Sequence, residues 1–186
     1  MAFKILVLGA IIFIGTHLIP ALGQSRAHLV NRLSLNGYKL LFTLLSVLGL
    51  GLMVWGKSTA PHSDIWFPPP WGRNAAMFIM FPSMVLLAVA KLPTNIKRVT
   101  PHPMMWGFIL WAIAHLLANG DLSSIILFGS IGAYSIIAIL SANQRGARIS
   151  TTTVPASRET ISLAFGVLVY VGLLYLHPYL FGPKLV

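Results

Sequence analysis

Six long apolar runs, separated by short polar links, constrain this chain more than any other feature of its sequence. Only three of its 186 residues are acidic, charged residues make up 9%, and apolar residues make up 56%. A soluble domain carries about a quarter of its residues as charge. Because so few charges leave most of the surface unhydrated, we predict an integral membrane protein. A membrane-spanning helix needs roughly 20 residues, so the spans use most of the chain, and residues 1–186 are predicted to form one transmembrane domain.

The apolar runs are continuous and lack the alternation of a transmembrane β-barrel, which favours helices. The predicted fold is therefore an all-α bundle of six transmembrane helices, at about residues 2–19, 38–55, 75–90, 103–118, 122–140 and 160–180. Pro82 predicts a kink in the third helix. The link Asn119–Gly120–Asp121 is so short that the fourth and fifth helices are predicted to form an antiparallel hairpin. The first run has features of a signal peptide, but its length and His17 near its end favour a retained span.

The distribution of basic residues predicts the orientation of the bundle. Loops that follow the odd-numbered spans hold nine basic residues: Arg26, Arg32, Lys39, Lys91, Lys97, Arg98, Arg145, Arg148 and Arg158. The other side holds four, which are Lys4, Lys57, Arg73 and Lys184. Basic loops stay in the cytoplasm, so we expect both termini on the periplasmic side of a bacterial inner membrane.

Two loops carry local signals. The loop between residues 57 and 73 contains Trp66, Phe67, Pro68, Pro69, Pro70 and Trp71. The loop is interpreted as an aromatic belt on a stiff turn, or alternatively as a lid over an outward-facing pocket. Before the last span, Ser157 is predicted to cap the helix, with Glu159 in its first turn.

Composition excludes several kinds of chemistry. The chain has no cysteine, so disulfides, thiolate nucleophiles and iron–sulfur clusters are excluded. Neither paired carboxylates nor a hydrolase, zinc-protease or nucleotide-binding motif is present. The net charge of +10 is explained by basic residues at span ends that meet anionic lipid, so nucleic acid is not an expected partner.

Histidines are the main candidates for function, because ionisable side chains inside a membrane are costly. His28 and His62 fall in loops and are interpreted as solvated. Those at the ends of spans or within them are His17, His102, His115 and His177. Each can be a neutral imidazole that donates a hydrogen bond to a neighbouring helix. The alternative is a shared metal, and an imidazole-rich interior that lacks carboxylates and cysteines suits haem iron with one or two axial histidines.

Several segments together resemble the NnrU family of membrane proteins. The most specific are HPMMWG at residues 102–107 and AHLLANGD at residues 114–121. GTHLIP at 15–20, YKLLF at 38–42 and LHPYLFG at 176–182 extend the resemblance over nearly the whole chain.

The resemblance implies an association with nitrite and nitric oxide reductases, since the family is named for genes that accompany them. It also implies a relation to plant 15-cis-ζ-carotene isomerase, an integral membrane enzyme that uses haem b. Histidines matching His17 and His115 are implicated in binding that haem, and a histidine matching His102 is present. That relative has a cysteine one turn before the second ligand, where this chain has Ala112. A mechanism that exchanges histidine for cysteine is therefore excluded here.

Depth along the predicted helices suggests a different pairing. His102 and His115 are thirteen residues apart, which is about 20 Å of helix. Two axial nitrogens of one iron lie only about 4 Å apart, since imidazole–metal bonds are about 2 Å long. By depth, His17 pairs better with His102, and His115 with His177. We keep His17 and His115 as the expected haem and metal ligands, with His102 as the rival.

Three functions follow as hypotheses. The first is a haem-binding inner-membrane protein that supports nitrite and nitric oxide reduction, with reductase components as partners. The second is a haem-dependent isomerase of a carotenoid-like polyene, held among Trp106, Phe108 and Trp111, although each aromatic alone is better explained by helix packing. The third is a cofactor-free assembly factor. A small transporter is disfavoured because the two halves show no internal repeat.

Overall fold

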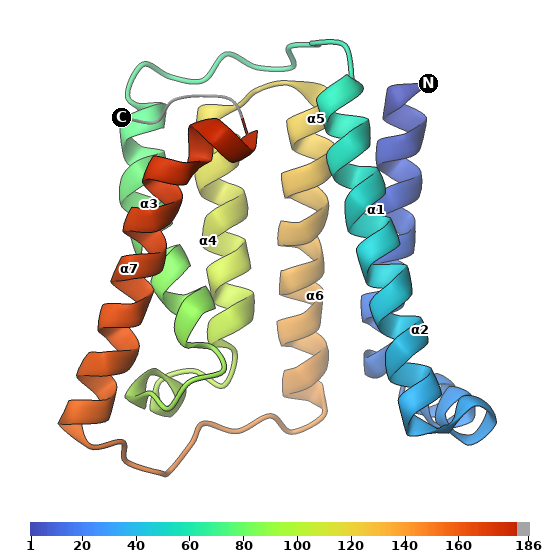
Figure 1. The fold of residues 1–186 in the computed structure, drawn as a ribbon, viewed down its shortest axis with the longest axis vertical. Coiled ribbons are helices and arrows are strands. Elements are labelled where there is room, and N and C mark those ends of the chain that lie inside the picture. The colour runs from blue at the N-terminus through green and yellow to red at the C-terminus, as the bar shows by residue number, and fades with distance from the viewer. Residues whose placement is uncertain (182–186) are drawn as a thin grey trace.

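The computed structural model describes residues 1–181 and is all-helical over that part of the chain (Figure 1). The main helices are α1 (Ala2–Leu18), α2 (Gly23–Thr59), α3 (Gly72–Val89), α4 (Pro103–Ala118), α6 (Ser130–Gln144) and α7 (Ala156–Phe181). Short elements connect them: η1 (Ile19–Ala21), η2 (Asn95–Arg98), α5 (Leu122–Ser124) and η3 (Ile125–Gly129). Gly182 of the last motif and Lys184 lie outside the described residues.

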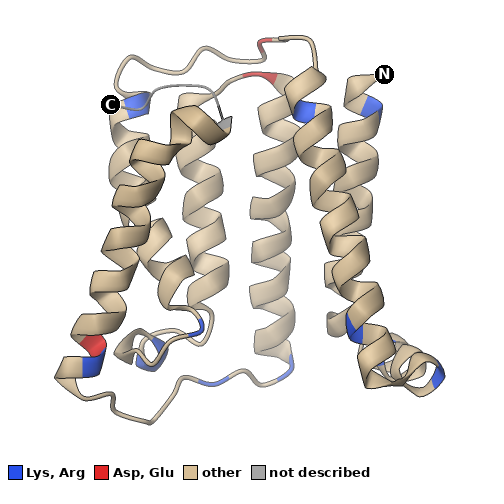
Figure 2. Ribbon diagram, in the orientation of Figure 1, with Lys and Arg blue, Asp and Glu red and all other residues tan. Residues whose placement is uncertain are grey.

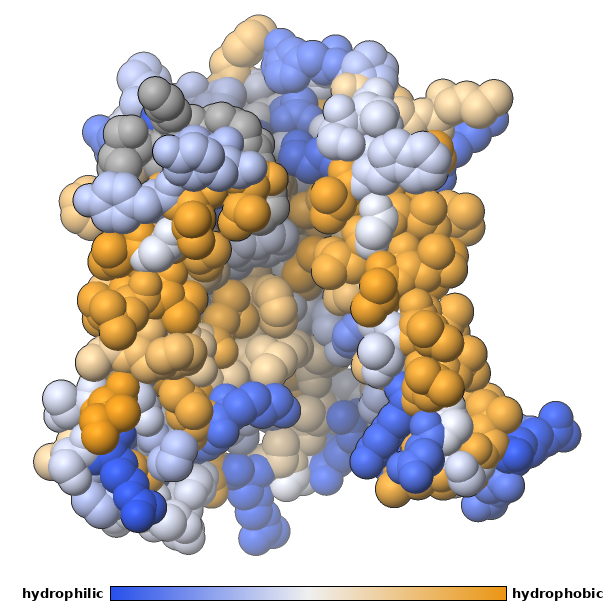
Figure 3. Space-filling model, in the orientation of Figure 1, coloured by the Kyte–Doolittle hydropathy of each residue, from blue (hydrophilic) through white to orange (hydrophobic). Residues whose placement is uncertain are grey.

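The prediction of an all-α fold with apolar helices long enough to cross a membrane is confirmed, whereas the count of six spans is not. Five helical stretches are long and apolar enough to cross a membrane: Ala2–Ala21, Gly23–Thr59, Gly72–Val89, Leu122–Gln144 and Ala156–Leu180. Helix α4 has only 16 residues, about 24 Å, which is shorter than the roughly 30 Å hydrocarbon layer. Figure 3 shows an apolar band across the molecule between more hydrophilic ends.

The helices pack as two groups joined by α6. Helices α1 and α2 form one pair, and α3, α4 and α7 form the other group. Helix α6 packs against α4 and also contacts α1, so it bridges the groups (Figure 1). Figure 3 shows that the face between α7 and α2 is hollowed, with apolar residues on its floor.

Glycines allow the close approach of α1 and α2. A Cβ added at Gly9 would lie 2.6 Å from the Met53 backbone nitrogen, and one at Gly56 would lie 2.5 Å from the Leu6 nitrogen. A Cβ at Gly49 would lie 2.7 Å from the Phe13 nitrogen. Small residues let helices in a bilayer approach closely enough for extensive van der Waals contact. The close approach of α1 and α2 explains why Leu6 on α1 and Met53 on α2 are fully buried.

The second helix begins earlier than predicted. The sequence predicts a start near Tyr38, whereas α2 begins at Gly23 and turns sharply at Ser34, whose backbone has φ 63° and ψ 168°. The polar residues of this segment hid its helical character from a search for apolar runs. Figure 1 shows the part before the turn lying across the end of the bundle, away from the direction of the span.

The loop after α2 is attached to the link between α4 and α5. The backbone nitrogen of Ile65 donates to the Gly120 carbonyl at 2.9 Å, and that of Leu122 donates to the Ser63 carbonyl at 2.8 Å. Trp66, Phe67 and Trp71 are exposed, as an aromatic belt requires. The loop is therefore held against the end of the bundle by backbone hydrogen bonds.

The last helix is anchored at its start by Glu159. Helix α7 begins at Ala156, so Ser157 lies inside its first turn and the predicted cap position is wrong. Glu159 lies in that turn, as predicted, and accepts from the Thr94 hydroxyl at 2.9 Å and from the Asn95 backbone at 2.6 Å. Its role is structural, because it ties the loop after α3 to α7.

Candidate functional site

His17 sits in the last turn of α1 with one nitrogen fixed by the backbone. Its Nδ1 lies 2.8 Å from the Phe13 carbonyl oxygen. Since a carbonyl only accepts, Nδ1 carries the proton and Nε2 keeps its lone pair. The ring packs 5.0 Å from Phe42 and 5.7 Å from Tyr134, measured between centroids. This tautomer and these aromatic neighbours suit an imidazole that binds a metal through Nε2.

A cavity opens beside His17. It has a volume of about 150 Å³, and its lining includes His17, Phe42, Tyr134 and Arg145. A second cavity of about 380 Å³ lies against it, since Pro20 and Phe42 line both. The volume of the smaller cavity is below the roughly 300–1,000 Å³ of typical ligand pockets, so a planar cofactor as large as haem would need more room than this cavity gives.

His115, in α4, repeats the arrangement of His17. Its Nδ1 lies 2.9 Å from the Trp111 carbonyl oxygen, which again leaves Nε2 with the lone pair. Its ring stacks on Phe128 at 4.3 Å and lies 4.7 Å from Trp111. Phe128 belongs to η3, a wide π-helical turn, and such turns are frequent at functional sites.

The two imidazoles contact different turns of the same helical stretch. His115 stacks on Phe128 and His17 lies against Tyr134, six residues further along, which is about 9 Å of rise. The rings therefore lie at different depths, as the sequence argument expects. Each imidazole could bind haem iron as a single ligand. The two rings differ too much in depth for their Nε2 atoms to lie about 4 Å apart.

The other two candidate histidines lie near different ligands: His102 lies toward the His17 end, and His177 lies near His115. His102 Nε2 is 2.7 Å from Asn143 Oδ1, at the same end of α6 as the cavity beside His17. His177 is close enough to His115 for an electrostatic interaction. In the described residues, 1–181, no group of three or more His, Asp or Glu side chains could hold a metal ion together.

The aromatic residues of α4 divide between core and surface. Phe108 and Trp111 pack edge to face at 6.4 Å and lie against the buried core. Trp106 is 44% exposed. Packing explains the first two, and Trp106 faces outward, so the three do not enclose one apolar chamber.

A polar network at the opposite end was missed by the sequence argument. Lys57 Nζ lies 2.6 Å from Ser124 Oγ and 3.7 Å from Asp121 Oδ1. It also lies 5.5 Å from the centroid of the Phe128 ring, the ring on which His115 stacks. Two features of the sequence could have indicated this network. Lys57 is a basic residue at the end of an apolar run, and Asp121 is an acidic residue six positions after His115.

Asp121 is the anion of this network. It accepts from the backbone nitrogen of Ser124 at 3.0 Å, from its hydroxyl at 2.5 Å, and from the Ser123 hydroxyl. Burial alone would raise the pKa of this carboxyl. The hydrogen bonds from Ser123 and Ser124, together with the charge of Lys57, outweigh burial and hold its pKa well below the usual 3.8.

Comparison with known proteins identifies one family. The family model described as NnrU protein matches residues 5–185, nearly the whole chain. No curated protein and no solved structure matches the chain.

Proposed function

Since the chain belongs to the NnrU family, we propose that it is a membrane-embedded haem b protein that supports nitrite and nitric oxide reduction. The observation that carries the proposal is His17. Its Nδ1 is held by the Phe13 carbonyl, its Nε2 keeps a lone pair, and it lines a cavity between aromatic rings. The family supplies the link to nitrogen oxides, because no residue of the site identifies such a substrate.

Each residue at the site has a defined part in this proposal. The Phe13 carbonyl fixes the tautomer and orientation of His17, while Phe42 and Tyr134 exclude water from one side of its ring. Haem, when bound, supplies one-electron redox chemistry. His115 is the expected second ligand and His102 its rival.

The difference in depth between His17 and His115 limits how the two histidines could bind one haem. A site held by both histidines would require His17 and His115 to come closer together, whereas a site held by one histidine would not. The two forms differ in their visible spectra, which makes the ligand set measurable without any assay of activity.

The test is a spectrum of the protein purified from cells supplied with haem precursor. We expect a Soret band, and loss of most haem content in His17→Ala. His115→Ala and His102→Ala then show which residue is the second ligand. His62→Ala is the matched control, because His62 is 74% exposed in a loop and pairs with Asp64. A colourless wild-type protein, or full haem content in the double variant of His17 and His115, would overturn the proposal.

The physiological part is tested separately. A strain lacking the protein should reduce nitrite or nitric oxide more slowly under low oxygen, and the wild-type chain should restore the rate. Unchanged reduction by that strain contradicts the nitrogen-oxide role even where haem is bound.

One observation favours a polyene isomerase as the second candidate. The hollowed face between α7 and α2 has an apolar floor (Figure 3), which suits a long apolar molecule entering from lipid. Ala112 is buried in place of the relative's cysteine, so the reaction would proceed without ligand exchange. If cells convert 15-cis-ζ-carotene only when they make this protein, the isomerase function replaces the first proposal.

A further inference from the structure

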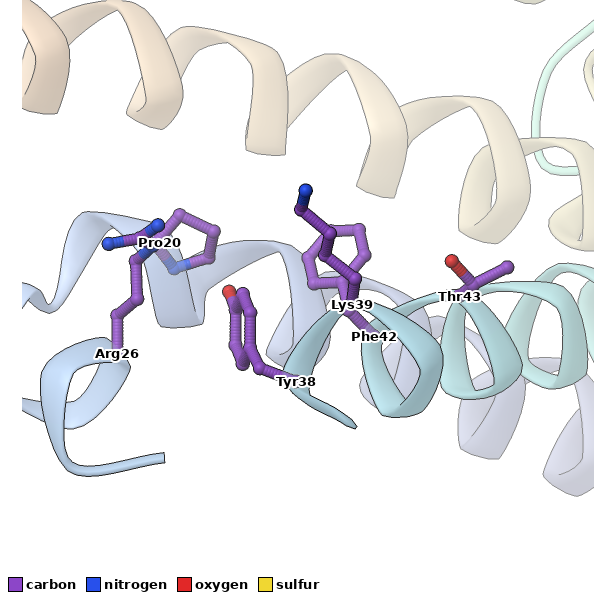
Figure 4. A pocket seen from close by; sticks show the side chains of 6 residues that line it. All are labelled: Pro20, Arg26, Tyr38, Lys39, Phe42 and Thr43. Atoms are coloured by element: carbon purple, nitrogen blue, oxygen red, sulfur yellow. The ribbon is translucent and has the colours of Figure 1, made fainter. Parts of the chain in front are cut away.

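The larger of the two cavities combines basic and polar side chains with apolar ones. It is lined by Pro20, Arg26, Tyr38, Lys39, Phe42 and Thr43. Figure 4 shows the polar ends of Arg26, Tyr38 and Lys39 directed to the same side of α2, with the proline and phenylalanine rings forming apolar walls. The lining includes two cations and no acid.

The sharp turn at Ser34 assembles this cavity. Arg26 and Tyr38 are twelve residues apart, so a straight helix would separate them by about 18 Å. Because the helix turns sharply at Ser34, the Arg26 guanidinium instead lies 5.7 Å from the centroid of the Tyr38 ring. A φ of 63° with ψ of 168° is a strained conformation for serine, and strain of this kind clusters at functional sites.

The Tyr38 hydroxyl points to a missing partner. Tyr38 is 7% exposed, and its hydroxyl has no hydrogen-bond partner among the described residues. A buried hydroxyl without a partner is costly. The neighbouring cations also lack a counterion: of the ion pairs found between residues 1 and 181, none involves Arg26 or Lys39.

An acceptor with negative charge would satisfy all three groups. Arginine, lysine and a tyrosine hydroxyl are donors suited to phosphate or carboxylate oxygens. We propose that the cavity formed by Arg26, Tyr38 and Lys39 binds the oxyanion group of a membrane-dissolved amphiphile, whose apolar part lies against Pro20 and Phe42. Basic pockets of this kind between membrane helices bind anionic lipid head groups.

Two sources of that oxyanion are available. One is the phosphate of an anionic phospholipid, and this arm is independent of the proposed function. The other is a carboxylate of haem, because the cavity adjoins the one lined by His17; this arm rests on the proposed function.

The experiment compares ligands with and without the anionic group, using the delipidated full chain in neutral detergent. Native mass spectrometry measures binding of phosphatidylglycerol against phosphatidylcholine, and absorbance measures binding of haem b against its dimethyl ester. The variants are Tyr38→Phe and Arg26→Gln. Arg32→Gln and Tyr175→Phe are matched controls, because both residues are exposed and lie outside the cavity.

For one of the two anionic ligands we expect at least about tenfold weaker binding in Tyr38→Phe and Arg26→Gln, since a hydrogen bond to a charged group is lost. Phosphatidylcholine or the haem ester should show no such change, and both controls should behave as wild type. Which ligand responds identifies the source of the oxyanion. Because Tyr38→Phe removes an unpartnered hydroxyl, it should not destabilise the ligand-free protein. Equal affinities across all variants, or an equal loss in Arg32→Gln, would overturn the proposal.

Discussion

The Lys57 ammonium lies 3.7 Å from Asp121 Oδ1, and this pair joins the last turn of α2 to the start of α5. The pair connects α2 to the helical stretch that leads into α6, at the end opposite the cavities. It also fixes η3, whose Phe128 stacks on His115. A charge pair between elements far apart in sequence thereby positions an aromatic neighbour of a candidate ligand.

Replacing Asp121 with alanine should destabilise the protein by about 1–3 kcal/mol, because the α5 cap is lost and Lys57 is left without its anion. Thermal unfolding in detergent measures the change. Asp64→Ala is the control: Asp64 is 44% exposed, so its variant should differ from wild type by less than about 0.5 kcal/mol. Equal stability of the two variants would show that the network contributes nothing.

Stability should also fall in acid. The pKa of Asp121 is lowered in the folded protein, so its contribution is complete above the usual value of 3.8 and is lost as pH falls through the folded value. Between these limits the loss is at most about 1.4 kcal/mol per pH unit. Melting temperatures at pH 7, 5, 4 and 3 should show a smaller acid effect in Asp121→Ala than in wild type. Parallel curves for the two proteins would assign the acid effect to other groups.

A methyl group at Gly56 should separate α1 from α2. Its Cβ would lie 2.5 Å from the Leu6 nitrogen, so backbone must move, at a cost of about 1–3 kcal/mol. Gly51→Ala is the matched control on the same helix, because a Cβ there meets nothing within 4 Å. Unfolding of the two variants in detergent gives the comparison. A loss as large in Gly51→Ala would point to helix propensity rather than packing.

The orientation of the bundle is open to a direct measurement. Basic residues cluster at the end that holds the start of α2, the end of α6 and the start of α7 (Figure 2). We expect this end in the cytoplasm. Reporter fusions in the loop at residues 91–100 should be active as cytoplasmic fusions, and those in the loop at 60–71 as periplasmic ones. The reverse result would invert the topology.

The sequence predicted most of the fold because bilayer solvation alone dictates long apolar helices. Helix α2 was placed too late because its first turns carry Arg26, His28 and Arg32, and a search for apolar runs passes over polar helical turns. Which histidines bind a metal stays a prediction, whereas the difference in depth between His17 and His115 followed from residue counting. The cavity at Tyr38 was out of reach, because it depends on the backbone angles of Ser34, which no composition or spacing encodes.

The helical stretch that begins with the wide turn at Ile125–Gly129 makes chain length, and not only residue type, a determinant of this site. A π turn holds one residue more than an α turn, so deleting one residue there would restore a regular α-helix and leave the residues after it facing nearly as before, whereas deleting one residue from the α-helical turn that follows would rotate Tyr134 by about 100° relative to Phe128. After that second deletion, Phe128 and Tyr134 would no longer face His115 and His17 together. Relatives that keep both contacts should therefore tolerate substitutions between Phe128 and Tyr134 more readily than insertions or deletions.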